Sequence, residues 1–86
     1  MPRYRYGIEE NAATALFALE DAQITRLISA IEALAAGPAT QPDSYSLDPQ
    51  SRRLANKIAG SFLIGNWFEH SAQRLHILRI DPLDPG

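Results

Sequence analysis

The sequence predicts a single α+β domain in which two N-terminal helices pack on one face of a small, mainly antiparallel four-stranded sheet. Three observations predict this class. An alternating strand comes first, two amphipathic helical stretches follow it, and the C-terminal part holds three strand-like segments. The expected order is β-α-α-β-β-β. A length of 86 residues suits one domain over residues 1–86.

A β-hairpin at residues 60–80 is the stretch on which the other elements are expected to assemble. Residues 62–68 and 75–80 are rich in aromatic and branched side chains, and a polar turn at residues 69–74 separates them. Because two strands alone are only marginally stable in water, this hairpin needs further strands and a helical cover.

An alternating segment near the N-terminus predicts the first strand. Tyr4, Tyr6 and Ile8 fall on one side of it, and Arg3 and Arg5 fall on the other. We therefore expect the two arginines on the face of the sheet that the helices leave open.

Two helices are predicted next, joined tightly as an antiparallel pair. The first opens at residues 9–11, where acidic side chains favour a helix N-terminus. The second begins at Asp21, its expected N-cap, and carries apolar residues at the spacing of one helical face. Gly37 is expected to end it in the left-handed conformation, and Pro38 cannot continue it.

The segment after the helices is predicted as a long loop followed by another strand. Residues 37–51 contain three prolines and many small polar residues, which indicates a loop. Residues 52–59 fit a helical turn or a strand, and alternation favours the strand. The alternating sets are Leu54, Asn56 and Ile58 on one side and Arg53, Ala55 and Lys57 on the other. Prolines at residues 81–86 predict an irregular tail.

The charge distribution allows a basic sheet face despite an acidic total. The net charge of −2 argues against a generic nucleic-acid-binding domain, which usually carries a basic excess. Residues 1–51 hold three basic and seven acidic side chains, whereas residues 52–86 hold five basic and three acidic ones. The bases lie mainly on or beside predicted strands, so we expect the open face to be basic.

Composition also bounds the compartment and the cofactors. The chain has no cysteine and no long uninterrupted apolar segment, which fits a cytoplasmic protein without a membrane partner. His70 and His76 lack the ligand spacing of a zinc site, and no phosphate-binding glycine motif occurs. We therefore expect neither a metal nor a cofactor.

The order of elements and several short motifs resemble the RelE/ParE superfamily of toxins from type II toxin–antitoxin modules. Residues 4–16 are similar to the family's opening strand and helix, and residues 31–38 to the end of its second helix. Residues 60–64 and 75–80 resemble its "G-x-Y-R-V" and "V-x-V-L-R-I" strands. The resemblance covers residues 3–80.

This resemblance implies a cytoplasmic toxin, of the kind linked to plasmid stabilisation, that is held by a cognate antitoxin in a hetero-oligomer or forms a homodimer. The first activity it implies is metal-independent endoribonuclease cleavage of ribosome-associated mRNA, which inhibits translation. Two alternatives stay open, namely inhibition of DNA gyrase in the ParE manner and a catalytically degenerate relative that only binds its antitoxin.

Two positions depart from the family pattern and leave the enzymatic activity open. Leu63 stands where many ribosome-dependent RNases of the family carry arginine. Asp81, Pro82 and Leu83 stand where the family often has His, Arg or Tyr. Metal-free RNA cleavage needs proton-transfer groups and a cation near the phosphorane. At both positions the residue that usually supplies such a group in the family is replaced.

The candidate site residues follow from the resemblance and from side-chain chemistry. Arg79 matches the arginine of the family's last strand, and Arg53 and Lys57 fall where basic residues of the family contact RNA, on the expected open face. The resemblance therefore implies catalytic roles for Arg79 and Lys57 and RNA binding for all three. The alternative for each is a solvated or carboxylate-paired strand residue.

Four further residues are considered on their chemistry alone. His76 can act as a general base, with a hydrogen-bonded structural histidine as the alternative. Arg3 and Arg5 flank Tyr4 and can bind phosphate, although alternating polar residues on a half-buried strand need no function. Trp67 is expected to pack on the sheet, and it could stack on a base if exposed.

Overall fold

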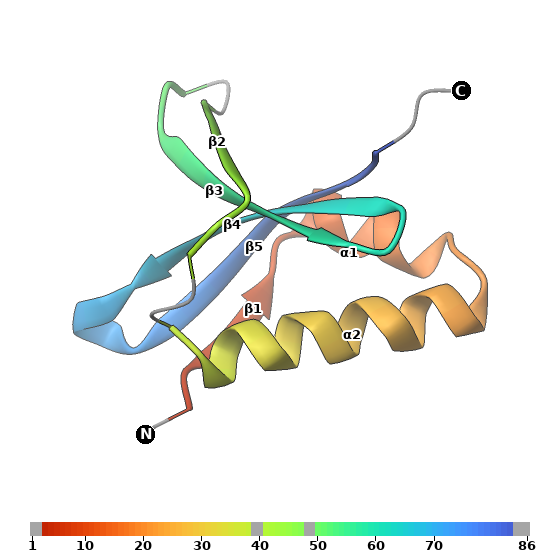
Figure 1. Ribbon diagram of the computed structural model, residues 1–86, viewed down its shortest axis with the longest axis horizontal. Coiled ribbons are helices and arrows are strands. Elements are labelled where there is room, and N and C mark those ends of the chain that lie inside the picture. The colour runs from red at the N-terminus through yellow and green to blue at the C-terminus, as the bar shows by residue number, and fades with distance from the viewer. Residues whose placement is uncertain (1–2, 39–40, 48–49, 84–86) are drawn as a thin grey trace.

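The computed structural model describes residues 3–38, 41–47 and 50–83. Within these residues the strands form one five-stranded sheet in the order β1-β5-β4-β3-β2, and two α-helices lie on one side of it (Figure 1). The elements are β1 (Arg5–Ile8), α1 (Glu10–Phe17), α2 (Asp21–Ala36), β2 (Ser44–Leu47), β3 (Arg53–Ala59), β4 (Phe62–Glu69), the 3-10 turn η1 (His70–Ala72) and β5 (Arg74–Pro82). The predicted α+β class is confirmed.

The prediction of four strands is wrong by one. β2, Ser44–Leu47, lies inside the segment predicted as a loop and pairs antiparallel with β3. Its sequence is too short to signal a strand, and it is held by tertiary partners: the Ile58 N–H donates to Oδ2 of Asp43 at 2.8 Å, and the Asp43 N–H donates to the Asn56 carbonyl at 2.8 Å. Residues 39–40 and 48–49 of the predicted loop lie outside the described residues.

The sheet is mixed rather than wholly antiparallel. The pairs β2–β3, β3–β4 and β4–β5 are antiparallel, as the hairpin pattern predicts, whereas β1 pairs parallel with β5 (Figure 1). The first and last described strands of the chain therefore lie side by side.

Three element ends differ from prediction. Glu20, not Asp21, is the N-cap of α2, and its N–H donates to Oε1 of Gln23 at 3.3 Å. Gly37 ends α2 with a φ of −129° instead of the left-handed conformation, and its N–H donates to two carbonyls of the last turn. β5 continues to Pro82, although a proline has no N–H to donate. β1 does not cover this part of β5, so no carbonyl of β1 is left without a donor there. Of the predicted tail, residues 84–86 lie outside the described residues.

The main core fills the space between the helices and the sheet. Its largest fully buried members are Leu16, Leu27, Ile31, Ile64, Leu75 and Ile77. Tyr6 and Ile8 of β1 pack against this core, as the alternation predicts. Of the helices described, neither has the length and apolarity needed to cross a membrane.

A bulge in β5 decides which of its side chains face the core. Gly65 pairs with Arg79, but the next residue, Asn66, pairs with Ile77, so Leu78 is an extra residue in β5. Strict alternation from His76 would turn Arg79 to the core. The extra residue resets the alternation, so His76 and Arg79 share the open face.

Candidate functional site

The face of the sheet opposite the helices is the candidate functional site. Alternation and register place on it the β4 residues Leu63, Gly65, Trp67 and Glu69, opposite the β5 residues Asp81, Arg79, His76 and Arg74. Leu54, Asn56 and Ile58 extend this face onto β3, and Ser44 and Ser46 extend it onto β2. We call this surface the open face.

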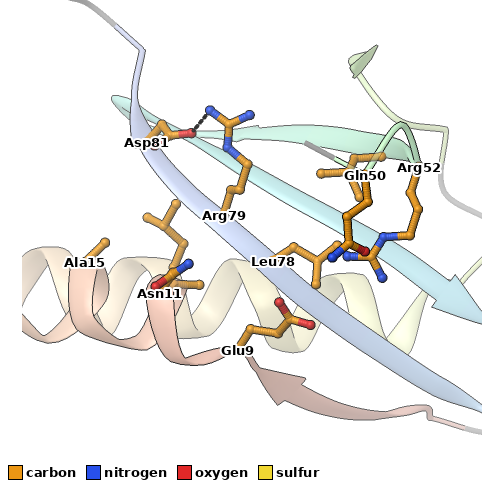
Figure 2. A pocket seen from close by; sticks show the side chains of 11 residues that line it. Glu9, Asn11, Ala15, Gln50, Arg52, Leu78, Arg79 and Asp81 are labelled. Carbon is orange, nitrogen blue, oxygen red and sulfur yellow. Dashed lines mark ion pairs between the residues drawn. The ribbon is translucent and has the colours of Figure 1, made fainter. Parts of the chain in front are cut away.

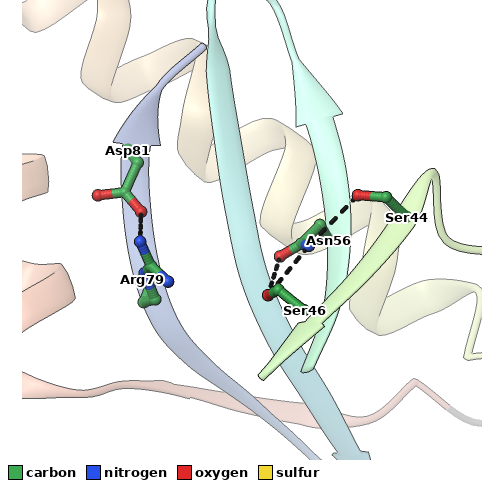
Figure 3. A network of polar contacts seen from close by, with 5 residues as sticks. All are labelled: Ser44, Ser46, Asn56, Arg79 and Asp81. Atoms are coloured by element: carbon green, nitrogen blue, oxygen red, sulfur yellow. Dashed lines mark hydrogen bonds and ion pairs between the residues drawn. The ribbon is translucent and has the colours of Figure 1, made fainter. Parts of the chain in front are cut away.

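Arg79 lies at the centre of the open face, above a glycine. A methyl group at Gly65 would lie 3.2 Å from Cβ and 3.7 Å from Cγ of Arg79, so the glycine makes room for the stem of the arginine. Nη2 of Arg79 lies 2.7 Å from Oδ2 of Asp81 (Figures 2 and 3). The guanidinium is half exposed and in part neutralised by this carboxylate.

A buried amide supports the other side of Gly65. Nδ2 of Asn56 donates to the hydroxyls of Ser44 at 3.3 Å and of Ser46 at 3.2 Å, and Asn56 is only 4% exposed (Figure 3). A methyl group at Gly65 would lie 3.5 Å from Oδ1 of Asn56. The network therefore links β2 to β3. On the open face, Gly65 lies between this network and the side chain of Arg79.

His76 is held by two neighbours. Nε2 lies 2.9 Å from Oε1 of Glu69, and the ring stacks on Trp67 at a centroid distance of 4.5 Å and an interplanar angle of 11°. An ionised carboxylate can only accept hydrogen bonds, so this contact puts a proton on Nε2 and leaves the lone pair of a neutral ring on Nδ1. His76 is thus oriented by a carboxylate, as a general base requires.

A cavity of about 560 Å³ opens beside Arg79, along the part of β5 that β1 does not cover (Figure 2). Its volume is in the range of small-ligand sites. Leu54 and Leu78 are buried at this cavity, outside the main core. The other labelled side chains around it are Glu9, Asn11 and Ala15 from α1 and its N-cap, Gln50 and Arg52 before β3, and Arg79 and Asp81 on β5.

The polar residues contributed to this cavity by α1 and by the segment before β3 were not predicted. Glu9 and Asn11 gave only a helix-start signal, and Gln50 and Arg52 gave only loop composition. They line the same cavity as Arg79 through tertiary packing, which no local pattern encodes. The cavity is therefore lined by a second guanidinium, a further carboxylate and two amides in addition to Arg79.

The expectation that Arg53 and Lys57 lie on the open face is wrong. Lys57 pairs with Ile64, a core residue, so both basic side chains of β3 project from the helix-bearing face. Nζ of Lys57 lies 3.6 Å from Oδ2 of Asp43, and the Arg53 guanidinium lies 3.8 Å above the Tyr45 ring. Leu54 misled the prediction because it is buried on the open face, at the cavity, and not in the main core.

The remaining predicted residues lie at the β1 end of the sheet. Arg5 points to the open face, as expected, and it lines a separate cavity with Arg3. His70 is in the turn η1, where its Nδ1 lies 2.8 Å from the Tyr4 hydroxyl and its ring stacks on Phe68. These contacts assign His70 a structural role.

No family model and no curated protein sequence matches the chain. Its structure is similar to a chain of the archaeal RelE-RelB complex from Pyrococcus horikoshii, with a TM-score of 0.77 and 17% sequence identity over 99% of this chain and 100% of that one. It is also similar to a chain of the toxin-antitoxin complex RelBE2 from Mycobacterium tuberculosis, with a TM-score of 0.75 and 17% identity over 94% and 99% of the two chains. The expected resemblance is thereby confirmed for the fold: the chain has a RelE-like toxin fold.

Proposed function

We propose that the chain is the toxin of a type II toxin–antitoxin module, that a cognate antitoxin binds it, and that it cleaves mRNA on the ribosome. The fold supports the toxin assignment, since similar chains come from the archaeal RelE-RelB complex and from the toxin-antitoxin complex RelBE2. The observation that carries the RNase proposal is the β5 bulge, which puts His76 and Arg79 on the same open face, where Arg79 also lines a polar cavity.

The proposed chemistry is metal-independent attack of a ribose 2′-oxygen on the adjacent phosphate. The lone pair on Nδ1 of His76 takes the 2′-hydroxyl proton, and Glu69 stabilises the imidazolium that forms. The Arg79 guanidinium stabilises the charge that develops on the phosphorane, the largest single contribution expected in such a site. The bond to the 5′-oxygen breaks, and that oxygen receives a proton from solvent, so the products are a 2′,3′-cyclic phosphate and a 5′-hydroxyl.

Arg52 is the proposed second cation. Leu63 occupies the strand position where many RNases of the family carry arginine, and an aliphatic side chain cannot contact phosphate electrostatically. Arg52 reaches the cavity of Arg79 from the segment before β3 and offers a guanidinium there (Figure 2). Lys57 projects from the other face of the sheet, which argues against a catalytic role together with Arg79 at one phosphate.

A second candidate function is a catalytically degenerate relative that only binds its antitoxin. The contact between Arg79 and Asp81 favours it, because a guanidinium engaged by a carboxylate at 2.7 Å has less charge to offer a phosphate.

Expression of the chain alone in a bacterial host separates these functions. Protein synthesis, mRNA ends and the DNA damage response are followed in the same culture, and Arg79→Ala is the test variant with Arg53→Ala as its matched control. We expect translation to stop at once with cut mRNA, in the control but not in the test variant. A damage response with intact mRNA would indicate a gyrase inhibitor, and unimpeded growth together with antitoxin binding would indicate the degenerate relative.

A further inference from the structure

Three arginines converge at the β1 end of the open face. Arg5 and Arg74 are direct neighbours in the parallel pairing of β1 with β5, and both are exposed. Together with Arg3 they line a cavity of about 460 Å³, completed by Ala72 and Gln73. We call Arg3, Arg5 and Arg74 the arginine cluster. Arg74 carried no motif or alternation signal in the sequence.

Within the part of the chain that the structure describes, the arginine cluster has no carboxylate partner. Among residues 3–38, 41–47 and 50–83, none of its three guanidiniums forms an ion pair. Glu69, the residue opposite Arg74 on β4, has its carboxylate at His76 instead. Like charges on directly paired strand residues destabilise a sheet. A bound anionic ligand would relieve this repulsion, so the cluster is suited to bind one.

A glycine connects the cluster to the candidate site. A side chain at Gly7 would lie 3.8 Å from Nη2 of Arg74, so the end of Arg74 lies over β1, where the strand has no side chain. Gly7 pairs with His76, the next open-face residue along β5 after Arg74. The cluster is therefore one step along the same face from the proposed general base.

The surroundings of the cluster favour a polyanion over an acidic protein segment. Apart from the arginines, the cavity is lined by Ala72 and Gln73, which offer no apolar pocket. Protein partners usually bind through a buried aromatic or aliphatic anchor, and no large apolar side chain lines this cavity for such an anchor to pack against. Guanidinium groups match the oxygens of phosphate in geometry as well as in charge.

We propose that the arginine cluster binds backbone phosphates of single-stranded RNA and directs the strand along β5 toward His76 and Arg79. The choice of RNA rests on the proposed function, but the binding step needs no cleavage. The cluster, rather than Arg79, then supplies most of the electrostatic attraction, because Arg79 is engaged by Asp81, whereas the cluster has no such partner among the described residues.

The test measures RNA binding by the full chain. A fluorescently labelled single-stranded RNA of about 12 nucleotides, long enough to span several phosphate contacts, is titrated at several salt concentrations and followed by anisotropy. The test variant carries Arg3→Gln, Arg5→Gln and Arg74→Gln. The control carries Arg26→Gln, Arg53→Gln and Lys57→Gln, which removes the same charge from the helix-bearing side.

We expect the test variant to bind RNA at least tenfold more weakly at low salt. The slope of the logarithm of the binding constant against the logarithm of the salt concentration should become shallower by about 2, as expected for the loss of three phosphate contacts to a single strand. The control should stay within about threefold, since its charges lie away from the proposed path. Thermal unfolding of both variants verifies that they fold. Equal losses in the two variants would overturn the proposal, because only net charge would then matter.

Two further outcomes decide between partners and between proposals. If polyglutamate binds through the cluster and RNA binding ignores it, the cluster serves a protein partner and the RNA proposal is wrong. If the unmodified chain binds RNA through the cluster but cleaves none in translating extracts, the cluster proposal holds and the RNase proposal fails. If RNA is cleaved but the cluster variant binds it unchanged, the RNase proposal holds and the cluster proposal fails.

Discussion

Nη2 of Arg79 lies 2.7 Å from Oδ2 of Asp81, two residues further along the same strand and on the same face of the sheet. Both side chains are exposed to about half their surface. An ion pair of this kind contributes only about 0–1 kcal/mol to stability. Its main effect is therefore on the charge that Arg79 presents, and this effect can be tested separately from folding.

Replacement of Arg79 by alanine should lower RNA cleavage by at least about 100-fold, the usual loss when one group that stabilises the transition-state charge is removed. Cleavage is measured on mRNA in a translating extract. Lys57→Ala and Arg53→Ala, on the other face, should retain activity within about threefold. Equal losses in all three variants would contradict the assignment of the site to the open face.

Asp81→Asn should raise the affinity for RNA several-fold. The amide keeps the shape of the side chain but removes the negative charge beside Arg79, which becomes free to contact phosphate. Titration with labelled RNA at low salt measures the change, and Asp43→Asn is the control because its carboxylate lies at Lys57 on the helix-bearing side. An unchanged affinity would mean that Arg79 contacts no phosphate.

Gly65→Ala should reduce cleavage more than it reduces stability. The added methyl group would lie 3.2 Å from Cβ of Arg79, so the arginine stem must shift by a few tenths of an ångström. Gly7→Ala is the matched control, since its nearest contact is an ordinary 3.8 Å. Cleavage rates and melting temperatures of the two variants are compared. If Gly65→Ala cleaves like the unmodified chain, Arg79 need not occupy its observed position.

Asn56→Ala should destabilise the fold by about 1–3 kcal/mol, because it removes the amide that bonds two hydroxyls in a buried network. Urea unfolding measures the free energy of unfolding. Ser29→Ala, at an exposed position of α2, is the control and should stay within about 0.5 kcal/mol. A loss below that value for Asn56→Ala would show that β2 contributes little to the sheet.

The stability of β2 should depend on pH through Asp43. The Ile58 N–H that donates to its carboxylate, with Lys57 adding to the effect, lowers the pKa of Asp43 below its ordinary value of 3.8. A lowered pKa favours the folded state above the unfolded pKa, and this contribution is lost as the pH falls below 3.8. The melting temperature of Asp43→Asn should therefore lie below that of the unmodified chain at about pH 6, and the difference should shrink toward about pH 3. A constant difference would contradict the linkage.

Local patterns predicted most of the fold. The periodicity of residues 21–36 and the alternation of residues 62–68 are properties of single elements, and the structure has both. β2 was missed because four residues bounded by prolines carry little signal, and their strand conformation depends on β3. The parallel partner of β1 was also beyond local patterns, since pairing between distant segments depends on the packing of the whole sheet.

The candidate site was predicted only in part, for two physical reasons. The first is the extra residue Leu78, without which the alternation of β5 would separate His76 from Arg79. The second is burial on both faces of β3, which made Leu54 indicate the wrong side and misplaced Arg53 and Lys57. Apolar alternation identifies a buried face only when the opposite face is exposed to solvent.

The pairing of Arg5 with Arg74 has a consequence for the order of events during synthesis. β1 emerges from the ribosome early but has no strand beside it until β5 has been made. At about 5–20 residues per second, the intervening residues take roughly 3–13 s to synthesise. Contacts between such distant segments also form slowly during folding. The cationic surface made by the two strands is therefore absent from the nascent chain, and the chain acquires it only after its own message has been translated past β5.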